Sequence, residues 1–202
     1  SSGSIVALDA THTSDRSVEF GFIYSSLMVN LRFGLEVLNP EDIKERSATN
    51  AAGTSLYKLD SEFSVTTPKM NIEINLYRGA SSRAMLITGV GYANLVARNA
   101  YTMTSTGTTA LGVTDFSEDL RGTTVSYEGG LGYEFLMTDT TTLLIEAGYR
   151  SMNFTTIKHN KDITGFQGAV VKGDRATNLD GSNRTLNLSN YYGGLTFRIW
   201  ID

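Results

Sequence analysis

A two-residue alternation that continues over an unusually long stretch limits the fold of this chain more than any other feature. Between Arg121 and Met137 one set of alternate positions carries Val125, Tyr127 and Leu131, and the other set, from Thr124 to Glu134, carries only Thr, Ser, Gly and Glu. Alternate residues of a β-strand point to opposite faces of its sheet. The pattern therefore predicts a long strand with one apolar and one polar face, and few soluble strands are so long.

The same alternation resumes after a turn at 138–140 and predicts a hairpin. A three-residue turn sets the following pairs opposite each other: Phe135 and Leu143, Tyr133 and Ile145, Gly129 and Tyr149, and Glu128 and Arg150. Side chains of directly opposed residues lie close together on one face. Apolar residues then share one face of the hairpin and opposite charges share the other.

Six strands are predicted in all, at 17–38, 54–77, 83–104, 120–137, 141–158 and 184–202. The phase of the alternation breaks near Ser25 and near Pro68, and each break could divide a long strand, which would give eight. Alternatively, residues 4–12 contribute a strand, or several chains share one barrel. We favour eight strands, because six are too few to close a single-chain barrel.

Composition agrees with an all-β single domain over residues 1–202. The chain has 20 glycines, 10 tyrosines and only 2 prolines. Its net charge of -4 comes without a basic run, which argues against nucleic acid as a partner. It contains no cysteine, which suits an oxidising compartment. No apolar run reaches the roughly 18 residues that a membrane-spanning helix needs.

The predicted connections are of two lengths. Short turns lie at 78–82 and 138–140, and long polar stretches lie at 39–53, 99–120 and 158–184. If successive strands alternate in direction, both short turns fall at one end of the sheet and the long stretches at the other. The stretch from Asn39 to Thr49 has Pro40 before an acidic first turn, which predicts a short loop helix.

Two architectures fit these strands. A soluble sandwich or lipocalin-like barrel would turn its apolar residues inward. A transmembrane barrel would turn them toward lipid and its polar residues toward the interior. Apolar faces of about 8 to 10 residues, polar faces that combine opposite charges with glycine, and the sorting of connections by length favour the membrane barrel.

The last twelve residues, YYGGLTFRIWID, carry a family resemblance. Their apolar face contains Tyr191, Leu195, Phe197, Ile199 and Ile201, and their other face contains Tyr192, Thr196, Arg198 and Trp200. With the strand pattern, this ending resembles small bacterial outer-membrane β-barrels of the OmpA transmembrane domain, OmpX or OmpW type. That family usually ends on an aromatic residue, whereas this sequence ends on Asp202.

The resemblance implies an antiparallel up-and-down transmembrane β-barrel in the bacterial outer membrane, with long loops on the outside. Its partners would be outer-membrane lipids and a small ligand or a surface partner at those loops. The function expected is a non-enzymatic one in envelope integrity, adhesion or ligand contact. A narrow pore for small solutes, a lipid-modifying barrel enzyme and a soluble lipocalin-like binding barrel are the alternatives.

Two sets of residues follow from this arrangement. Charged residues on the polar faces are expected to form an ion-pair network that fills the lumen: Arg32, Glu36, Glu73, Glu128, Glu134, Glu146, Arg150 and Arg198. The lipid-facing set is Leu131, Tyr133, Phe135, Leu143, Ile145, Leu195, Phe197 and Ile199. In the pore alternative, Arg150 and Glu128 would exchange partners.

Catalytic and metal sites are weakly indicated. The two histidines are His12 and His159, and an enzyme would need His159 near Ser151, Asp162 or Ser182. A histidine in a solvated loop is the simpler interpretation. The segment from Asn178 to Ser182 has oxygen ligands but lacks an acidic first ligand, so it predicts an Asp-Gly turn and no calcium loop. We expect no cofactor and no metal.

Overall fold

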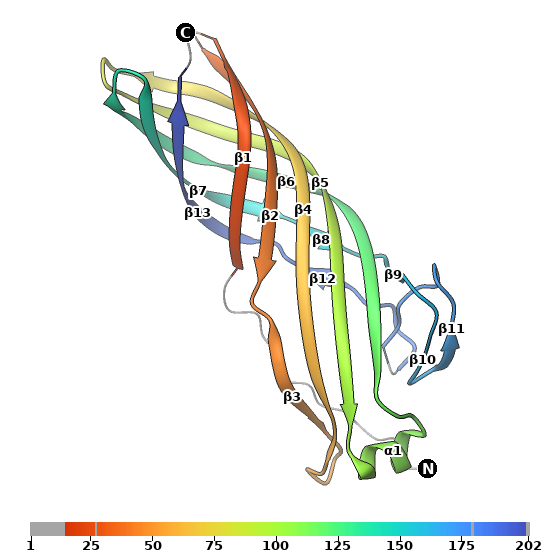
Figure 1. Cartoon of the computed structure of the whole chain (residues 1–202). Helices are drawn as coiled ribbons and strands as arrows, with labels where there is room; N and C mark the ends of the chain where they lie inside the picture. The colour runs from red at the N-terminus through yellow and green to blue at the C-terminus, as the bar shows by residue number, and fades with distance from the viewer. Residues whose placement is uncertain (1–14, 27, 179, 201–202) are drawn as a thin grey trace.

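The computed structural model describes residues 15–26, 28–178 and 180–200, most of which lie in β-strands (Figure 1). Seven long strands form the main path of one antiparallel sheet, in the order β1-β2-β4-β5-β6-β7-β13. Their bounds are β1 Asp15–Ser25, β2 Val29–Pro40, β4 Ser55–Arg78, β5 Ser82–Met103, β6 Phe116–Thr138, β7 Thr141–Ser151 and β13 Asn190–Ile199. The sheet curls into a half-barrel, which confirms the all-β antiparallel prediction.

Shorter elements gather at one end of the sheet. β3 (Ile43–Thr49) pairs with β4, and β9 (Ile157–His159) pairs with β6. β10 (Ile163–Gly165) pairs with β11 (Gly168–Val170), and β8 (Asn153–Phe154) pairs with β12 (Leu186–Asn187). The helix α1 (Ser105–Leu111) lies at this end too, whereas the short turns lie at the opposite end, as predicted (Figure 1).

The strand registers match the sequence prediction around the turn at 138–140. Phe135 lies opposite Leu143 and Tyr133 opposite Ile145. Gly129 lies opposite Tyr149, and Glu128 opposite Arg150. The alternation of side chains was sufficient to fix this hairpin.

The two breaks in the alternation have different outcomes. The break near Ser25 is a turn, since β1 ends at Ser25 and β2 begins at Val29. The division expected near Pro68 is wrong, because β4 continues through Pro68 without a register shift on its β2 side. Residues 4–12 and the two terminal residues Ile201 and Asp202 lie outside the described residues, as does His12.

The loop helix predicted between Asn39 and Thr49 is also wrong. That segment forms the end of β2 and then β3, whose Ala48 is fully buried against β4. The helix of the described chain is instead α1, within the predicted 99–120 loop. Thr104 caps its first turn by accepting a hydrogen bond from the Gly107 amide, and Gly112 ends it in the left-handed conformation.

The polarity of the sheet inverts along its strands, and this explains the apparent break near Pro68. On β4 the outward residues Lys58, Asp60 and Glu62 are exposed, whereas the outward residues Met70 and Ile74 farther along are apolar. The inward residues change in the opposite direction, from apolar to polar. We call the part with the short turns the short-turn half (β1, β2, β7, β13, and residues 67–78, 82–92 and 125–138), and the remaining elements the long-loop half.

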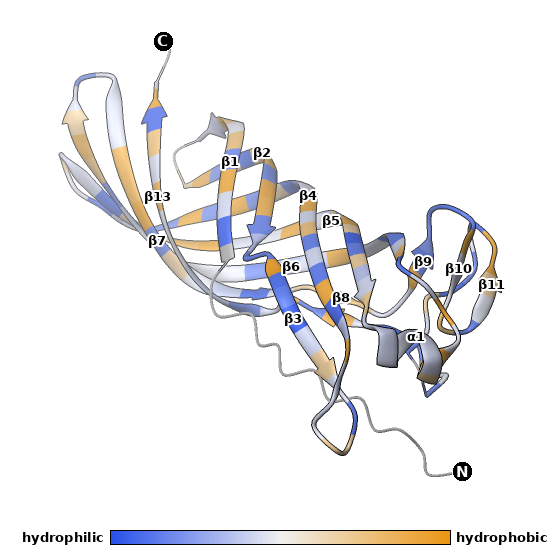
Figure 2. Cartoon of the chain, turned by 60° about the horizontal axis from the view of Figure 1, so that its bottom comes forward, coloured by the Kyte–Doolittle hydropathy of each residue, from blue (hydrophilic) through white to orange (hydrophobic). Residues whose placement is uncertain are grey.

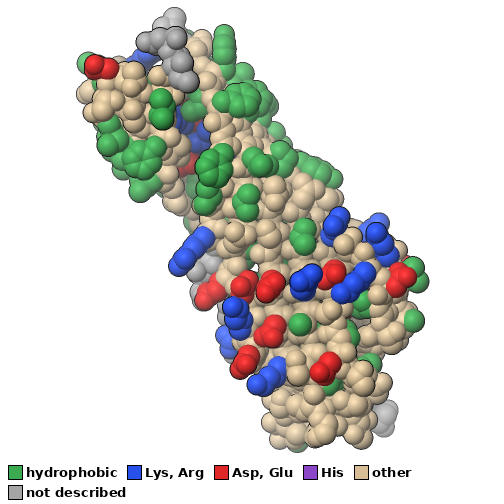
Figure 3. All heavy atoms as spheres, in the orientation of Figure 1, with side chains coloured by type: hydrophobic (Ala, Val, Ile, Leu, Met, Phe, Trp, Pro, Cys, Tyr) green, Lys and Arg blue, Asp and Glu red, His purple; other side chains and the backbone are tan. Residues whose placement is uncertain are grey.

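The two halves bury different groups. The long-loop half is apolar inside, with a core that includes Val65, Leu95, Leu120, Phe154 and Ile157. The short-turn half is apolar outside, and inside it contains charged residues together with a small apolar cluster of Met85, Ile87 and Leu144. Hydrophobic side chains spread over its surface, and Lys, Arg, Asp and Glu form a band on the surface of the long-loop half (Figure 3). Figure 2 shows the alternation of apolar and polar residues along the strands.

Candidate functional site

The interior of the short-turn half is a network of buried charges. All eight residues of the predicted lumen set point inward from β2, β4, β6, β7 and β13. Glu73 is 0% exposed, Glu134 is 1% exposed and Arg198 is 4% exposed. Because a buried charge without a partner is strongly unfavourable, the ion pairs among these residues decide whether the interior is stable.

Arg198 of β13 connects two glutamates near the short-turn end. Its guanidinium contacts Glu73 on β4 and lies 2.9 Å from the Glu134 carboxylate on β6. Arg83 adds a second contact to Glu134, with 2.7 Å between Nε and Oε2. The Thr142 hydroxyl donates a hydrogen bond to Glu134. A single arginine thus joins three separate strands.

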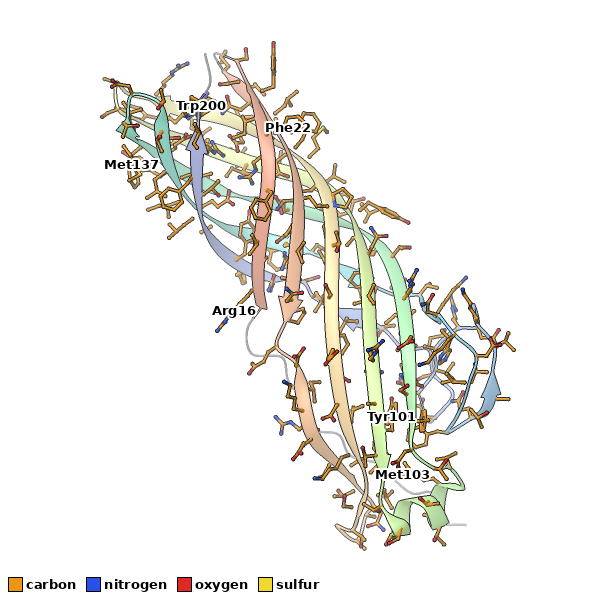
Figure 4. All side chains as sticks on the ribbon, in the orientation of Figure 1. Arg16, Phe22, Tyr101, Met103, Met137 and Trp200 are labelled. Carbon is orange, nitrogen blue, oxygen red and sulfur yellow. The ribbon has the colours of Figure 1, made fainter. Side chains whose placement is uncertain are left out.

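Trp200 covers this cluster at the end of β13 (Figure 4). Its indole Nε1 donates a hydrogen bond of 3.1 Å to Thr142 Oγ1. The Arg83 guanidinium carbon lies 5.0 Å from the centre of the Trp200 ring, which is a cation–π distance. These contacts place an aromatic side chain beside the charges at the short-turn end, where Arg83, Glu134, Thr142 and Trp200 also line a cavity.

A second group of charges crosses the middle of the interior. Arg32 of β2 lies 3.1 Å from Glu146 of β7, and it also reaches Glu73 at 3.6 Å. Arg150 of β7 lies 2.9 Å from Glu36 of β2. β2 and β7 are not neighbours in the sheet. These ion pairs therefore bring opposite walls of the half-barrel together.

Lys69 is the central cation that sequence reasoning missed. Its ammonium lies 2.9 Å from Glu19, 3.2 Å from Glu128 and 3.4 Å from Glu36. Lys69 directly follows Pro68, where the alternation appeared to break. Counting every second residue back from Glu73 through Asn71 would have placed Lys69 inward.

The expected contact between Glu128 and Arg150 is replaced by contacts with other partners. The two residues are register partners on β6 and β7. However, Arg150 binds Glu36 and donates to Asn190 Oδ1 at 3.2 Å, whereas Glu128 accepts from Asn71 and Lys69. Contacts across the interior replace the direct Glu128–Arg150 contact, because in this arrangement each acid lies beside a cation or an amide donor.

The outward face of the short-turn half is a continuous apolar surface. All eight residues of the predicted lipid-facing set lie on it, with Leu131 61% exposed and Phe197 69% exposed. Phe135 and Leu143, which are register partners, are partly buried. Aromatic pairs add to this surface, for example Phe22 and Phe33 with ring centres 5.3 Å apart. Large exposed apolar surfaces mark contacts with membranes or other proteins.

The long-loop half contains a buried polar cluster around Glu118. The Glu118 carboxylate pairs with Arg184 and accepts a hydrogen bond of 3.1 Å from the Tyr101 hydroxyl. Burial raises the pKa of the Tyr101 phenol above its ordinary value. Tyr101 also stacks on Phe116, with ring centres 4.5 Å apart, beside the loops at the far end of β5 (Figure 4). Through the Arg184–Glu118 ion pair, this cluster holds the loop that follows β11 against the sheet.

His159 lies beside this cluster, and the expectation of a solvated loop histidine is wrong. The side chain is 6% exposed, because β9 packs it against β6, and burial lowers the pKa of the imidazole. Its Nδ1 has no hydrogen-bond partner among the described residues. Among the described residues, no hydrogen bond or ion pair joins His159 to Ser151, Asp162 or Ser182, so the side chains that an enzyme would need are not brought together.

The segment from Asn178 to Ser182 forms the predicted turn. Gly181 has a φ of 82°, and the Ser182 amide donates to Asp180 Oδ1 at 2.9 Å. Within residues 15–26, 28–178 and 180–200, no group of three or more His, Cys, Asp or Glu side chains could hold a metal ion. The same residues contain no helix that is long and apolar enough to span a membrane.

Comparison of the chain with protein-family models, with curated proteins and with solved structures finds no match. The physical arrangement of the side chains is therefore the basis for a functional conclusion.

Proposed function

We propose that this protein is a membrane-spanning β-barrel of the bacterial outer-membrane type, whose charged interior is closed to solutes and whose long-loop half projects from the membrane as a binding platform. The work of such a protein is structural or adhesive and not enzymatic. The resemblance to the OmpA, OmpX and OmpW group supports the same proposal.

The observation that carries the proposal is the inversion of polarity within single strands. On β5 the outward residues Leu86 and Val90 are 40% and 41% exposed, and the outward Arg98 farther along is charged. On β6 the outward Leu131 and Tyr133 likewise give way to Asp119. In a soluble barrel the same face of each strand stays polar along its whole length. In a barrel that extends beyond a bilayer, the outward face is apolar inside the bilayer and must become polar outside it.

The length of the apolar part agrees with a bilayer. Residues 67–78 of β4 extend roughly 40 Å along the strand, which at a tilt of about 45° spans about 28 Å. The apolar band of known outer-membrane barrels is about 25 Å tall. The remaining residues of β4, from 55 to 66, extend beyond that band and carry the charged outward residues.

The interior contacts argue for a closed lumen. Arg198, Arg32 and Arg150 each connect strands that are not neighbours, and their side chains occupy the space between the walls. Barrels of about eight strands have an interior just wide enough for side chains to fill. We therefore favour a sealed barrel over a narrow pore.

Refolding into lipid vesicles tests the proposal. The full chain should insert, migrate differently on a gel before and after heating, and protect the strands of the short-turn half from protease while the long-loop half is cleaved. Planar bilayers containing the protein should stay silent. A chain that is monodisperse in buffer without detergent would contradict membrane insertion, and discrete conductance steps would contradict the sealed lumen and favour a pore.

A further inference from the structure

Three exposed cations lie side by side on the outward face of the long-loop half. Arg121 of β6 is the register partner of Lys158 of β9, and Lys158 is in turn bridged to Arg175 in the segment after β11. All three side chains are exposed. Residues directly opposite each other on neighbouring strands place their side chains on the same face, with Cα atoms about 4.5–5.5 Å apart. We call these three residues the cation row.

Among the described residues, no ion pair joins an acid to the cation row. The nearest acid on the outward face of β6 is Asp119, and both of its carboxylate oxygens have other partners. Oδ1 lies 3.2 Å from Arg98 and Oδ2 lies 3.2 Å from Lys161. Within the row, Arg175 donates a hydrogen bond of 3.3 Å to the neutral hydroxyl of Thr156. Because like charges opposite each other destabilise a sheet, the row has a free-energy cost that a bound anion would remove.

The cation row lies just beyond the apolar face of the short-turn half. Val96 of β5, the register partner of Arg121, is 52% exposed, and on β6 the apolar outward face begins at Val125. The four residues from Arg121 to Val125 extend roughly 13 Å along the strand, or about 9 Å along the membrane normal at a tilt of about 45°. The headgroup region adds roughly 5–8 Å on each side of the hydrocarbon, and long cationic side chains bend toward it. Lipid headgroups are therefore within reach of the row.

We propose that the cation row binds a lipid headgroup that carries more than one phosphate, in the leaflet on the long-loop side of the membrane. Guanidinium and ammonium groups both bind phosphate in proteins, and arginine does so through two parallel hydrogen bonds. The row extends over three neighbouring strands, which is roughly 10 Å, so its cations can contact phosphates that lie apart on one headgroup. The inference rests on the proposed membrane-spanning function, because that function sets the depth of the row.

The net charge of the chain and the position of the row favour a lipid over a dissolved anion. The chain as a whole carries a charge of -4, so its overall field does not draw anions from solution. A lipid headgroup is instead held beside the row by its own acyl chains, which would lie against the exposed apolar side chains of Val96 and Val125. Such tethering raises the effective concentration of phosphate at the row. Each cation then needs to contribute only modestly to the affinity.

Lipid binding in detergent tests the inference. The full chain is folded in a non-ionic detergent, and its affinity for cardiolipin, a lipid with two phosphates, is measured by native mass spectrometry. The neutral-row variant, Arg121→Gln with Lys158→Gln and Arg175→Gln, should bind cardiolipin at least about tenfold more weakly, since each cation near an anionic lipid surface contributes about fivefold. Without lipid, this variant should unfold at the same urea concentration as the wild-type chain or at a higher one, because repulsion within the row is removed.

The matched control variant removes three exposed cations elsewhere in the long-loop half, on β3 and β4: Lys44→Gln with Arg46→Gln and Lys58→Gln. It changes the net charge by the same amount as the neutral-row variant and should bind cardiolipin as the wild-type chain does. Inorganic phosphate, added at the same phosphate concentration, should not displace the bound lipid.

Three results would overturn the inference: equal affinity of the wild-type chain and the neutral-row variant, an equal loss of affinity in the control variant, and displacement of cardiolipin by inorganic phosphate. The second result would mean that net charge alone attracts the lipid, and the third would assign the row to dissolved anions. Insertion into vesicles is measured separately. A chain that inserts but binds cardiolipin equally without its cation row contradicts this inference alone, whereas a chain that fails to insert contradicts the proposed function.

Discussion

At the scale of single residues, the buried arginines determine the stability of the short-turn half. Replacing Arg198 by Met leaves the fully buried Glu73 with Arg32 at 3.6 Å, and leaves Glu134 with Arg83 alone. Removing one partner of a buried ion pair costs about 3–5 kcal/mol. The free energy of unfolding of Arg198→Met, measured by urea titration in detergent or lipid, should fall by that amount.

A double variant and a surface variant check the cause. Adding Glu73→Gln to Arg198→Met should recover part of the loss, since one uncompensated charge is removed. Arg98→Met breaks an exposed contact of 3.2 Å with Asp119 and should change the free energy of unfolding by about 0–1 kcal/mol. If Arg198→Met were no more damaging than Arg98→Met, the network would not stabilise the fold.

His159 should make the long-loop half sensitive to acid. Burial lowers the pKa of its imidazole below the ordinary 6.5, with Arg184 acting in the same direction and Glu118 and Asp174 opposing it. As the pH falls through about 6.5, the unfolded segment binds a proton that the folded one does not, so stability decreases until the folded pKa is reached. Above about pH 7.5 the residue adds no pH dependence.

Hydrogen exchange of the amides around β9 measures this effect. Between pH 8 and pH 5.5, after correction for intrinsic exchange rates, their protection should decrease in the wild-type chain and decrease less in His159→Gln. The other histidine, His12, is present in both proteins, so its contribution cancels. Equal pH profiles in the two proteins would exclude His159 as the source of the acid sensitivity.

At the scale of strands, glycines decide how closely neighbouring strands approach. Gly130 of β6 and Gly148 of β7 are register partners on the inward face. A Cβ atom at Gly130 would lie 2.5 Å from the Ala147 carbonyl oxygen, whereas a Cβ atom at the outward Gly129 meets nothing within 4 Å. Gly130→Val should therefore lower the free energy of unfolding by about 1–3 kcal/mol or more. Gly129→Val should leave it nearly unchanged, and similar losses for both variants would contradict this packing argument.

The sequence was sufficient to predict those parts of the strands that depend on alternation alone. The register of β6 on β7 and the inward position of the charged residues follow from a period of two. The continuity of β4 through Pro68 was not predictable in the same way, because a reversal of polarity looks like a change of phase. The strand β3 was also missed, because pairing with β4 overrides the local helical composition after Pro40. The helix α1 was missed as well, within the segment 99–120 that was predicted as a long loop.

The partners within the charged network could not be read from the sequence either. Arg32 and Glu146 are 114 positions apart, and only the curl of the sheet brings them together. Alternation states which face a charge occupies, but not which strand lies opposite across the interior. The same limit applies to His159, whose burial depends on the packing of β9 against β6.

At the scale of the whole molecule, the boundary between the two halves should be the boundary of the membrane. Leu131 lies on the outward face of the short-turn half, and Val96 lies on the outward face of β5 within the long-loop half. The two side chains are 61% and 52% exposed, so neither substitution disturbs a packed core. An arginine on the lipid face destabilises a barrel by about 2–4 kcal/mol at the middle of the bilayer, and this cost falls to about 0–1 kcal/mol near the interface.

Leu131→Arg should consequently destabilise the protein by about 2–4 kcal/mol in lipid vesicles, and Val96→Arg by less than about 1 kcal/mol. Reversible unfolding in vesicles measures both. The comparison uses the same introduced residue on two outward positions of neighbouring strands, so it isolates the depth of each position in the membrane. Equal effects of the two variants would mean that lipid does not surround the short-turn half, and its apolar face would then need another protein to cover it.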